Sequence, residues 1–319
     1  MVEISSVGIL NEYFVDRTNE RVKGFFLEPI ESEVSLDNII KGFDEQFKHN
    51  VDRVTARIFL TNKLLPYLRD NLKSHLEAIV PLDGEFKELS LIYLGKNVPS
   101  RYEKKGITYQ EIKMADEINS TDRVVDYDTS ILKVTSKNFS VNIEDTLSIK
   151  DEERLVAIYK KSFSDTYLFE MNLENVQKLT RNKNNIKAIA RNNNEIVSIG
   201  VGEFKEFKVD NKNFKLVELS DAATDTDYMN NGLYTATCAL LMKKFYKRKI
   251  DLIYGEARAA HKGVNIACKT SGRNLYGMLH KHCKIGGPKT INETGPYENL
   301  NVWAITFNSL SRICNGGRK

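Results

Sequence analysis

The chain has 319 residues, of which 41% are hydrophobic, and this is enough apolar material for two domains of ordinary size. Its 47 basic and 43 acidic side chains leave a formal charge of +4, which is too small to argue for nucleic acid as a partner. The opening residues MVEISSVGIL contain no basic stretch followed by a long apolar one, and no run of about 18 apolar residues occurs elsewhere. The sequence therefore predicts a soluble cytoplasmic protein that does not act at a membrane.

Cysteine and histidine usage gives no pattern of metal ligands. The cysteines all lie in the last third of the chain, at Cys238, Cys268, Cys283 and Cys314. No two have the two-residue spacing of common zinc or redox pairs, so a reduced cytosolic setting fits them best. Two nearby histidines, His280 and His282, are too few to argue for a metal site. We expect no metal.

Residues 1–140 are predicted to form an amino-terminal accessory domain of mixed α and β structure. Hydrophobic spacing predicts helices over 35–48 and 62–76 and strands over 51–60 and 88–95. This order allows a degenerate half-copy of the domain that follows. The alternative is an unrelated domain that covers a substrate cleft or a dimer surface, and a homodimer therefore stays open.

A domain boundary is predicted near residue 140, where alternating residues give way to a helix-like start. The second domain is predicted over 141–308, with a carboxy-terminal tail over 309–319. It should begin with two helices, at 151–163 and 174–179. Three strands then alternate with Asn- and Asp-rich turns, which favours an antiparallel meander, at 186–191, 196–207 and 214–223. A turn, a helix, a strand, a helix and two closing strands follow, at 229–232, 233–248, 251–259, 263–271, 275–284 and 299–307.

The turn at 229–232 separates a predicted strand from a predicted helix. Free backbone N–H groups and the helix dipole favour an anion such as phosphate at such a place. The turn matches neither the Walker pattern nor the three-glycine dinucleotide fingerprint, because it contains only Gly232. A strand, turn and helix late in a meander resemble the GCN5-related N-acetyltransferase superfamily, whose pyrophosphate loop has the pattern Arg/Gln-x-x-Gly-x-Gly/Ala. The aligned residues here are Met229-Asn230-Asn231-Gly232-Leu233-Tyr234, which keep only the central glycine.

Downstream, the runs EARAAHKGVNIACKTSGRNLYGMLHKHCKI and YENLNVWAITF resemble the bacterial and archaeal β-lysine N-acetyltransferases. The shared features are an Ala-Arg-Ala strand, a Gly-x-Asn helix start, two spaced glycines and a Glu-x-x-Asn-x-Trp close. The matching residues are Ala257, Arg258, Ala259, Gly263, Asn265, Gly272, Gly277, Glu298, Asn301 and Trp303. The resemblance implies the superfamily's α+β fold, with a mixed and largely antiparallel sheet, and acetyl-CoA as the co-substrate.

The resemblance also implies catalytic roles. A carboxylate should accept the proton of the attacking amine, and the candidates are Asp221, slightly favoured, and Glu218. These two should point to opposite faces of a strand unless a bulge intervenes, and a solvated strand carboxylate is the alternative for each. Cys268 stands where many members have the tyrosine that protonates the leaving CoA thiolate. A packed thiol is the more common meaning of such a cysteine, and Tyr276 is a substitute donor.

For acetyl-CoA, the resemblance implies backbone contacts beside a splayed strand, the pyrophosphate loop and an asparagine near the pantetheine arm. The residues are Ala223, Thr224, Asp225, Met229, Asn230, Asn231, Gly232, Leu233, Tyr234 and Asn265. A plain helix cap is the alternative role for Asn265. The substrate candidates, for which core packing is the alternative, are Tyr167, His282, Glu298 and Asn301.

The sequence therefore predicts an acetyl-CoA-dependent N-acetyltransferase that acts by direct transfer on a small amino acid or diamine, with β-lysine as the first candidate. A peptide or a natural-product amine is the alternative acceptor. A catalytically silent acyl-CoA-binding module and a protein that keeps only the fold are the alternatives from other classes. Selectivity depends on side chains scattered over loops, so the sequence does not identify the amine.

Overall fold

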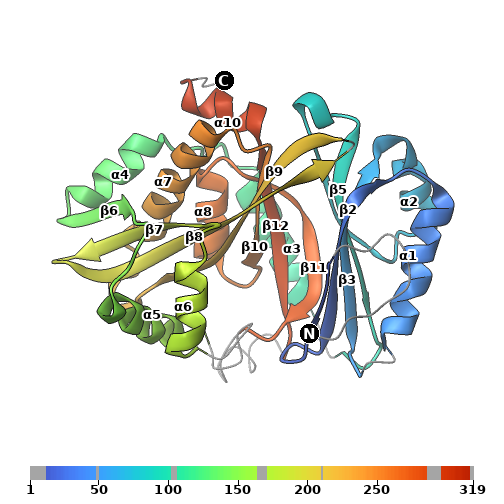
Figure 1. Cartoon of the computed structure of the whole chain (residues 1–319), viewed down its shortest axis with the longest axis horizontal. Helices are drawn as coiled ribbons and strands as arrows, with labels where there is room; N and C mark the ends of the chain where they lie inside the picture. Colours follow the sequence, from blue (N-terminus) through green and yellow to red (C-terminus); the bar gives the residue numbers. More distant parts are fainter. Residues whose placement is uncertain are drawn as a thin grey trace.

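The computed structural model describes residues 12–47, 50–101, 106–163, 171–209, 211–285 and 296–316. Within these residues the strands form one sheet, in the order β1-β2-β3-β5-β4-β11-β12-β10-β9-β8-β7-β6 (Figure 1). The parallel neighbours in this sheet are β2 with β3 and β9 with β10, and the other pairs are antiparallel. The predicted α+β class with a mixed, largely antiparallel sheet is confirmed.

The first half of the chain contributes five strands and, on their outer face, two helices. Its elements are β1 (Glu12–Asp16), β2 (Arg21–Ile30), α1 (Glu33–Gln46), β3 (Arg53–Thr61), α2 (Leu65–Asn71), β4 (Leu76–Pro81) and β5 (Leu89–Asn97). Ser32 caps α1 by accepting a hydrogen bond from the Ser35 backbone N–H. Pro66 lies in the first turn of α2, where its missing N–H costs nothing, so α2 is shorter than the predicted 62–76. The sequence did not predict β1, β2 or β4.

Two helices connect the halves, and the second half then follows the predicted order. The elements are α3 (Ile107–Asn119), α4 (Tyr127–Thr135), β6 (Phe139–Ile143), α5 (Ile149–Ser162), α6 (Leu173–Arg181), β7 (Asn185–Asn192), β8 (Glu195–Val209), β9 (Lys212–Thr224), α7 (Leu233–Arg248), β10 (Leu252–Arg258), α8 (Lys262–Thr270), β11 (Asn274–Cys283), β12 (Glu298–Thr306) and α10 (Phe307–Cys314). The meander β7-β8-β9 is antiparallel, as predicted. The described part of the predicted tail is helix α10, which buries Leu310 against the core beside α7.

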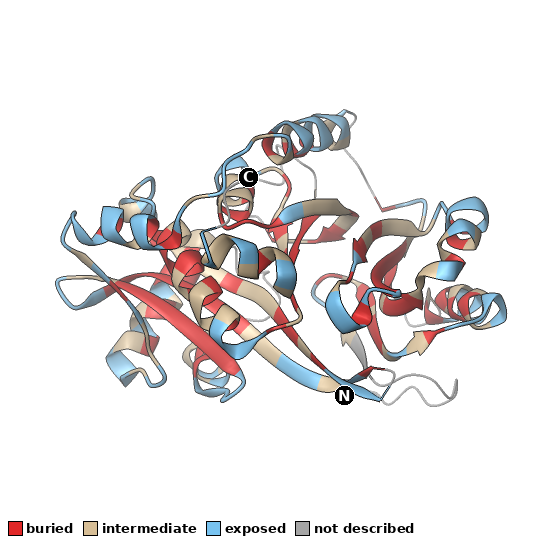
Figure 2. Cartoon of the chain, turned by 90° about the horizontal axis from the view of Figure 1, so that it is seen from above, coloured by how far each residue is buried: buried red, intermediate tan, exposed pale blue. Residues whose placement is uncertain are grey.

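Helices cover both faces of the sheet in the second half. Helices α5 and α6 lie on one face, and α4, α7 and α10 lie on the other (Figure 1). Buried residues follow the strands, whereas exposed residues lie mainly on the outer helix surfaces (Figure 2). Helices α3 and α4 pack against α8 and α7, so the segment that precedes the predicted boundary lies against the second half. The division near residue 140 itself stays a prediction.

The two halves share one connection pattern. In the first, β2-α1-β3-α2-β4-β5 gives the sheet order β2-β3-β5-β4; in the second, β9-α7-β10-α8-β11-β12 gives β9-β10-β12-β11. Each begins with a parallel pair and continues with antiparallel ones. The halves join where Gly277 of β11 pairs with Ala78 of β4. A Cβ at Gly277 would lie 2.1 Å from the Glu77 carbonyl oxygen, so this close approach requires glycine.

One hydrophobic core crosses the junction between the halves. Phe59 and Phe86 of the first half pack against Phe214 of β9, with ring centroids 5.2 and 4.8 Å apart. Polar contacts add to this packing, since Arg57 of β3 contacts Glu218 of β9 at 3.1 Å. The amino-terminal half is therefore packed against the strands that, as described below, form the candidate site.

Among the described residues, no helix is both long and apolar enough to cross a membrane. The same part of the chain contains no group of three or more His, Cys, Asp or Glu side chains arranged to hold a metal ion.

Candidate active site

The sheet opens between β9 and β10. These strands pair in parallel only at residues 216–218 with 252–254, although β9 continues to Thr224 and β10 to Arg258. The unpaired stretches 219–224 and 255–258 line the two sides of a cavity of about 640 Å³. Over these stretches the two strands do not pair with each other, and side chains of Tyr159, Ser162 and Asn265 donate instead to the carbonyls of Asp221, Thr224 and Arg258. These two stretches form the walls of a cleft because the two strands diverge here.

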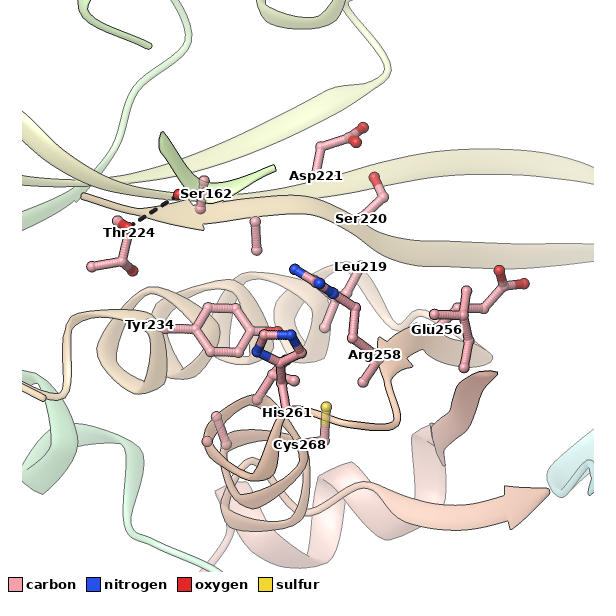
Figure 3. A pocket seen from close by; sticks show the side chains of 18 of the residues that line it. Ser162, Leu219, Ser220, Asp221, Thr224, Tyr234, Glu256, Arg258, His261 and Cys268 are labelled. Atoms are coloured by element: carbon pink, nitrogen blue, oxygen red, sulfur yellow. Dashed lines mark hydrogen bonds between the residues drawn. The ribbon is translucent and has the colours of Figure 1, made fainter. Parts of the chain in front are cut away.

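A bulge in β9 determines which side chains face one another. Opposite β8, Ala223 pairs with Ile199 and Ser220 with Val201, so two residues of β9 oppose one of β8. Within the bulge Asp221 has a φ of 43°, a left-handed conformation that is uncommon for residues other than glycine. Figure 3 shows the side chains of Ser220 and Asp221 on the same side of β9 and that of Leu219 on the other.

The same bulge decides the relation between the two predicted bases. Glu218 is two residues before Ser220 and shares its face of the strand, so it also shares the face of Asp221. The two carboxylates were expected on opposite faces unless a bulge intervened, and the structure contains that bulge.

The predicted pyrophosphate loop forms the wall at one end of the cleft. Met229, Asn230, Gly232, Leu233 and Tyr234 line the cavity. Gly232 has a φ of 80° and is the N-cap of α7, and no side chain caps this helix. The first N–H groups of the 16-residue helix are therefore without intrahelical partners and point out of its positive end. This arrangement suits a phosphate group.

Asn231 and Asp225 have structural roles in this turn. The Asn231 side-chain amide donates to the carbonyls of Tyr228 and Met229, and Asn231 does not line the cavity. Asp225 is fully buried and pairs with Arg154 and with Lys161, the latter at 3.0 Å. The predicted backbone contact at Asp225 is wrong, because its N–H donates to the Val197 carbonyl. Ala223 and Thr224 do line the cavity.

A third carboxylate, Glu203 of β8, joins the two predicted candidates. Glu203 lies opposite Glu218 in the antiparallel pair and accepts a hydrogen bond from Ser220 Oγ, and Ser220 lines the cavity. Burial raises the pKa of Glu203 to about 7, and the charges of Glu218 and Asp221 add to this effect.

Glu218 behaves in the opposite way. Burial alone would raise its pKa, but Arg57, Lys23 and the Tyr254 hydroxyl outweigh burial and lower it to about 2. Both Arg57 and Tyr254 donate hydrogen bonds to Glu218 Oε2. Glu218 therefore stays ionised and paired at neutral pH, which makes it a poor proton acceptor. Sequence reasoning missed Glu203 because no residue of its strand is near the recognised patterns.

A buried cation lies where β9 and β10 separate. Arg273 is 1% exposed, lines the cavity and makes no ion pair among the described residues. It donates hydrogen bonds to Ser271 Oγ at 3.0 Å and, more weakly, to Cys238 Sγ, and it also interacts with the Tyr234 hydroxyl. A Cβ added to Gly255 would lie 3.0 Å from Arg273 Nη1 and 2.9 Å from the Leu219 carbonyl oxygen, so Gly255 makes room for this guanidinium. A buried charge without a counterion is costly, which favours an anionic ligand in this cleft.

Cys268 also lines the cleft, at the position predicted for the acid. It is 1% exposed and packs with Ala257 and Trp303. Burial raises the pKa of its thiol to about 11, although Arg273 acts in the opposite direction. The thiol is therefore protonated at neutral pH. The substitute donor Tyr276 packs against the core and does not line the cavity.

Asn301 and Trp303 of the Glu-x-x-Asn-x-Trp close form one buried hydrogen-bond network with Asn265. Asn265 Oδ1 accepts from Asn301 Nδ2 and from Trp303 Nε1, both at 2.8 Å. Its amide group donates to the carbonyls of Arg258 and His261. Asn265 and Asn301 are fully buried and do not line the cavity. Their side chains fasten α8 to β10 and β12, which is the packing role.

Two other predicted substrate residues, Glu298 and His282, do not line the cavity themselves, and a third lies outside the described residues. Glu298 forms a bidentate ion pair with Arg258, at 2.7 Å for each bond, and Arg258 lines the cavity. His282 is 2% exposed and lies behind the cleft, where burial and then Arg21 and Arg53 hold its pKa well below the usual range. Tyr167 lies outside the described residues.

The other end of the cleft is completed by the amino-terminal half. Arg21 and Lys23 of β2 line it, together with Glu256 of β10. In Figure 3 Glu256 lies at the opposite end from Thr224 and Tyr234, with Ser220 between them. Sequence reasoning missed Lys23 because β2 was not predicted, and it missed Arg273 because a single arginine carries no pattern.

No family model matches the chain, and no curated protein matches it. Among solved structures it is similar to the ribosomal-protein-S18-alanine N-acetyltransferase from Escherichia coli, at 14% identity and a TM-score of 0.41, over 53% of this chain and 94% of that one. It is similar to Arabidopsis thaliana NAA60, solved with a bisubstrate analogue, at 14% identity and a TM-score of 0.42, over 53% and 99%. It is also similar to the ribosomal-protein-alanine N-acetyltransferase from Brucella melitensis, at 15% identity and a TM-score of 0.41, over 52% and 98%. These likenesses are of fold at low identity, and the resemblance to the β-lysine enzymes stays a prediction.

Proposed function

We propose that the protein is an acetyl-CoA-dependent N-acetyltransferase that acts on a small amine. The observation that carries the proposal is the opening between β9 and β10, closed at one end by the left-handed Gly232 and the uncapped start of α7. A long ligand with phosphates at one end fits this cleft, because its phosphates would meet the helix N-terminus and its chain would meet unpaired strand edges. The buried Arg273 favours an anionic group further along the cleft.

Acetyl-CoA supplies a thioester whose acetyl group passes to the amine while the CoA thiolate leaves. Residues of the chain would perform three tasks. The turn at 229–232 and the first N–H groups of α7 would hold the pyrophosphate. Asp221 would orient the acceptor's amine at the cleft. Arg273 would stabilise the negative charge that develops on sulfur, where Cys268 replaces the superfamily's tyrosine.

The proton of the attacking amine needs an acceptor near neutral pH. A free lysine-type amine has a pKa of about 10.4 and is mostly protonated at pH 7. Glu203 suits the task best, because its pKa of about 7 is close to the working pH and Ser220 connects it to the cleft. Glu218 would remain an ionised neighbour that helps to keep the pKa of Glu203 high. This assignment moves the principal base role from Asp221 to Glu203.

The acceptor that we propose is a small amino acid or diamine, with β-lysine as the first candidate. The test is release of free CoA thiol from acetyl-CoA in the presence of a panel of amines, with the acetylated product identified by mass spectrometry. Acetylation of a panel member, slowed in Asp221→Asn without loss of CoA binding, is expected. CoA binding without transfer to any panel member would contradict the enzyme proposal and favour a silent acyl-CoA-binding module.

A further inference from the structure

The end of the cleft that Arg21, Lys23 and Glu256 line is here called the acceptor end. Among the described residues, two charged groups at this end have no partner of opposite charge in contact. Lys23 lines the cavity, and its side chain makes no hydrogen bond or ion pair among the described residues. Glu256 lines it too, and its side chain is 10% exposed. The contact recorded for Glu256 within the described part of the chain is with His282 Nε2, at 3.6 Å.

His282 does not neutralise Glu256. Its Nδ1 accepts a hydrogen bond from Arg53 Nε at 3.3 Å, so its remaining proton lies on Nε2 and faces Glu256. Because burial, Arg21 and Arg53 hold the pKa of His282 well below its usual range, the imidazole is neutral. Glu256 therefore faces a neutral imidazole beyond hydrogen-bonding distance, and among the described residues no cation in contact with it neutralises its charge.

The two arginines at this end of the cleft already form ion pairs within the protein. Arg21 pairs with Asp16 at 2.8 Å, and Arg258 pairs with Glu298 at 2.7 Å. Lys23 differs from them, because burial and the neighbouring Arg21 lower its pKa, whereas Glu256 opposes this effect. A nearby anion would stabilise the charged form of such a lysine, and the described part of the chain places no anion in contact with Lys23.

Resting on the proposed function, we infer that Lys23 and Glu256 bind the carboxylate and the ammonium of an amino-acid head group, so that the acceptor is an amino acid rather than a simple diamine. The amine to be acetylated would be the distal one, which reaches Ser220 and Asp221 at the middle of the cleft (Figure 3). The amino-terminal half would then complete the acceptor site, since Lys23 is on β2. This gives that half a function in substrate selection.

The test compares acceptors that differ only by a carboxylate: β-lysine with 1,4-diaminopentane, and L-lysine with 1,5-diaminopentane. For the wild type, the amino acid of at least one pair should have a KM at least tenfold below that of its diamine. Lys23→Met should raise that KM at least tenfold and leave the KM values for the diamine and acetyl-CoA unchanged.

Lys96→Met is the matched control, because Lys96 is on β5 of the same half, does not line the cavity and pairs with Asp44 at the surface. Glu256→Gln should weaken both members of the pair, since both carry the ammonium.

Calorimetric binding of the same four compounds, with and without desulfo-CoA, separates this inference from the proposed function. Amino-acid binding that is lost in Lys23→Met but not in Lys96→Met would support the head-group site even if no acetyl transfer occurred. Equal KM and binding for amino acids and diamines, or a Lys23→Met variant unchanged in both readouts, would overturn the inference. Absence of binding by both amino acids would overturn it too, whatever the protein does with acetyl-CoA.

Discussion

Glu203 is the residue whose ionisation should be visible in the activity of the enzyme. With its pKa raised to about 7, the base is protonated below that pH, so kcat/KM should rise as the pH increases through about 7. Glu203→Gln should lower kcat by about 10²–10⁴-fold and abolish this rise. A pH profile measured from 5.5 to 9 tests the prediction. If the rise persisted in Glu203→Gln and disappeared in Asp221→Asn, the base would be Asp221.

Glu203 should also affect stability, independently of any substrate. Its folded-state pKa lies above the unfolded value, so between pH 4.5 and 7 the folded state binds more protons, and stability falls as the pH rises through this window. Glu218 is ionised in both states above pH 5 and does not contribute there. The melting temperature of the wild type should therefore fall more between pH 5 and 8 than that of Glu203→Gln. Parallel curves would contradict the raised pKa.

Arg273 is expected to act on the sulfur of CoA. Arg273→Met should lower kcat by about 10²–10³-fold, the usual effect of removing a preorganised charge donor. In the wild type CoA should bind more tightly as the pH rises and its thiol ionises, whereas desulfo-CoA should show no such change. Arg273→Met should remove this difference, and Arg273→Lys should keep part of it. A structural role for Arg273 would affect both ligands equally.

At the scale of elements, the turn before α7 can be tested against a similar turn elsewhere. Gly232 and Gly106 are both N-caps with left-handed φ, of 80° and 83°, but Gly106 begins α3 and does not line the cleft. Proline cannot adopt a positive φ, so Gly232→Pro and Gly106→Pro should both lower the melting temperature. Only Gly232→Pro should weaken acetyl-CoA binding, as measured by calorimetry. Equal weakening in both variants would mean that the effect is one of general stability.

The sequence predicted most elements of the second half, because apolar spacing, Asn-rich turns and a glycine before a helix are local signals. The turn at 229–232 and helix α7 were predicted at the residues where they occur. The bulge at Asp221 could not be predicted, since it depends on the register with β8. Strand β2 was missed as well, and with it the contribution of Lys23 to the cleft.

The candidate site, too, was predicted only where local sequence patterns identify its residues. Asp221, Glu218 and Cys268 were predicted from a family pattern, and all three line the cleft. Glu203 and Arg273 reach this place through strand pairing and through packing between distant segments, which no single stretch of sequence reveals. Asn265 and Asn301 belong to the same family pattern, but their hydrogen bonds are used within the protein.

At the scale of the whole molecule, the two halves share a connection pattern but not a cleft. In the first half β2 and β3 stay paired from Arg21 and Arg53 to Phe26 and Ile58, and they pair again at Ile30 and Leu60. Only two residues separate β2 from α1, whose start is capped by the Ser32 side chain. In its described residues, the first half therefore lacks both the opening between parallel strands and the uncapped helix start that characterise the second half.

A calorimetric titration of the full chain with acetyl-CoA tests the proposed cofactor site most directly. We expect saturable binding of one molecule per chain, at the cleft between β9 and β10, and marked weakening in Gly232→Pro but not in Gly106→Pro. No binding at millimolar acetyl-CoA, or binding that Gly232→Pro leaves unchanged, would contradict this expectation.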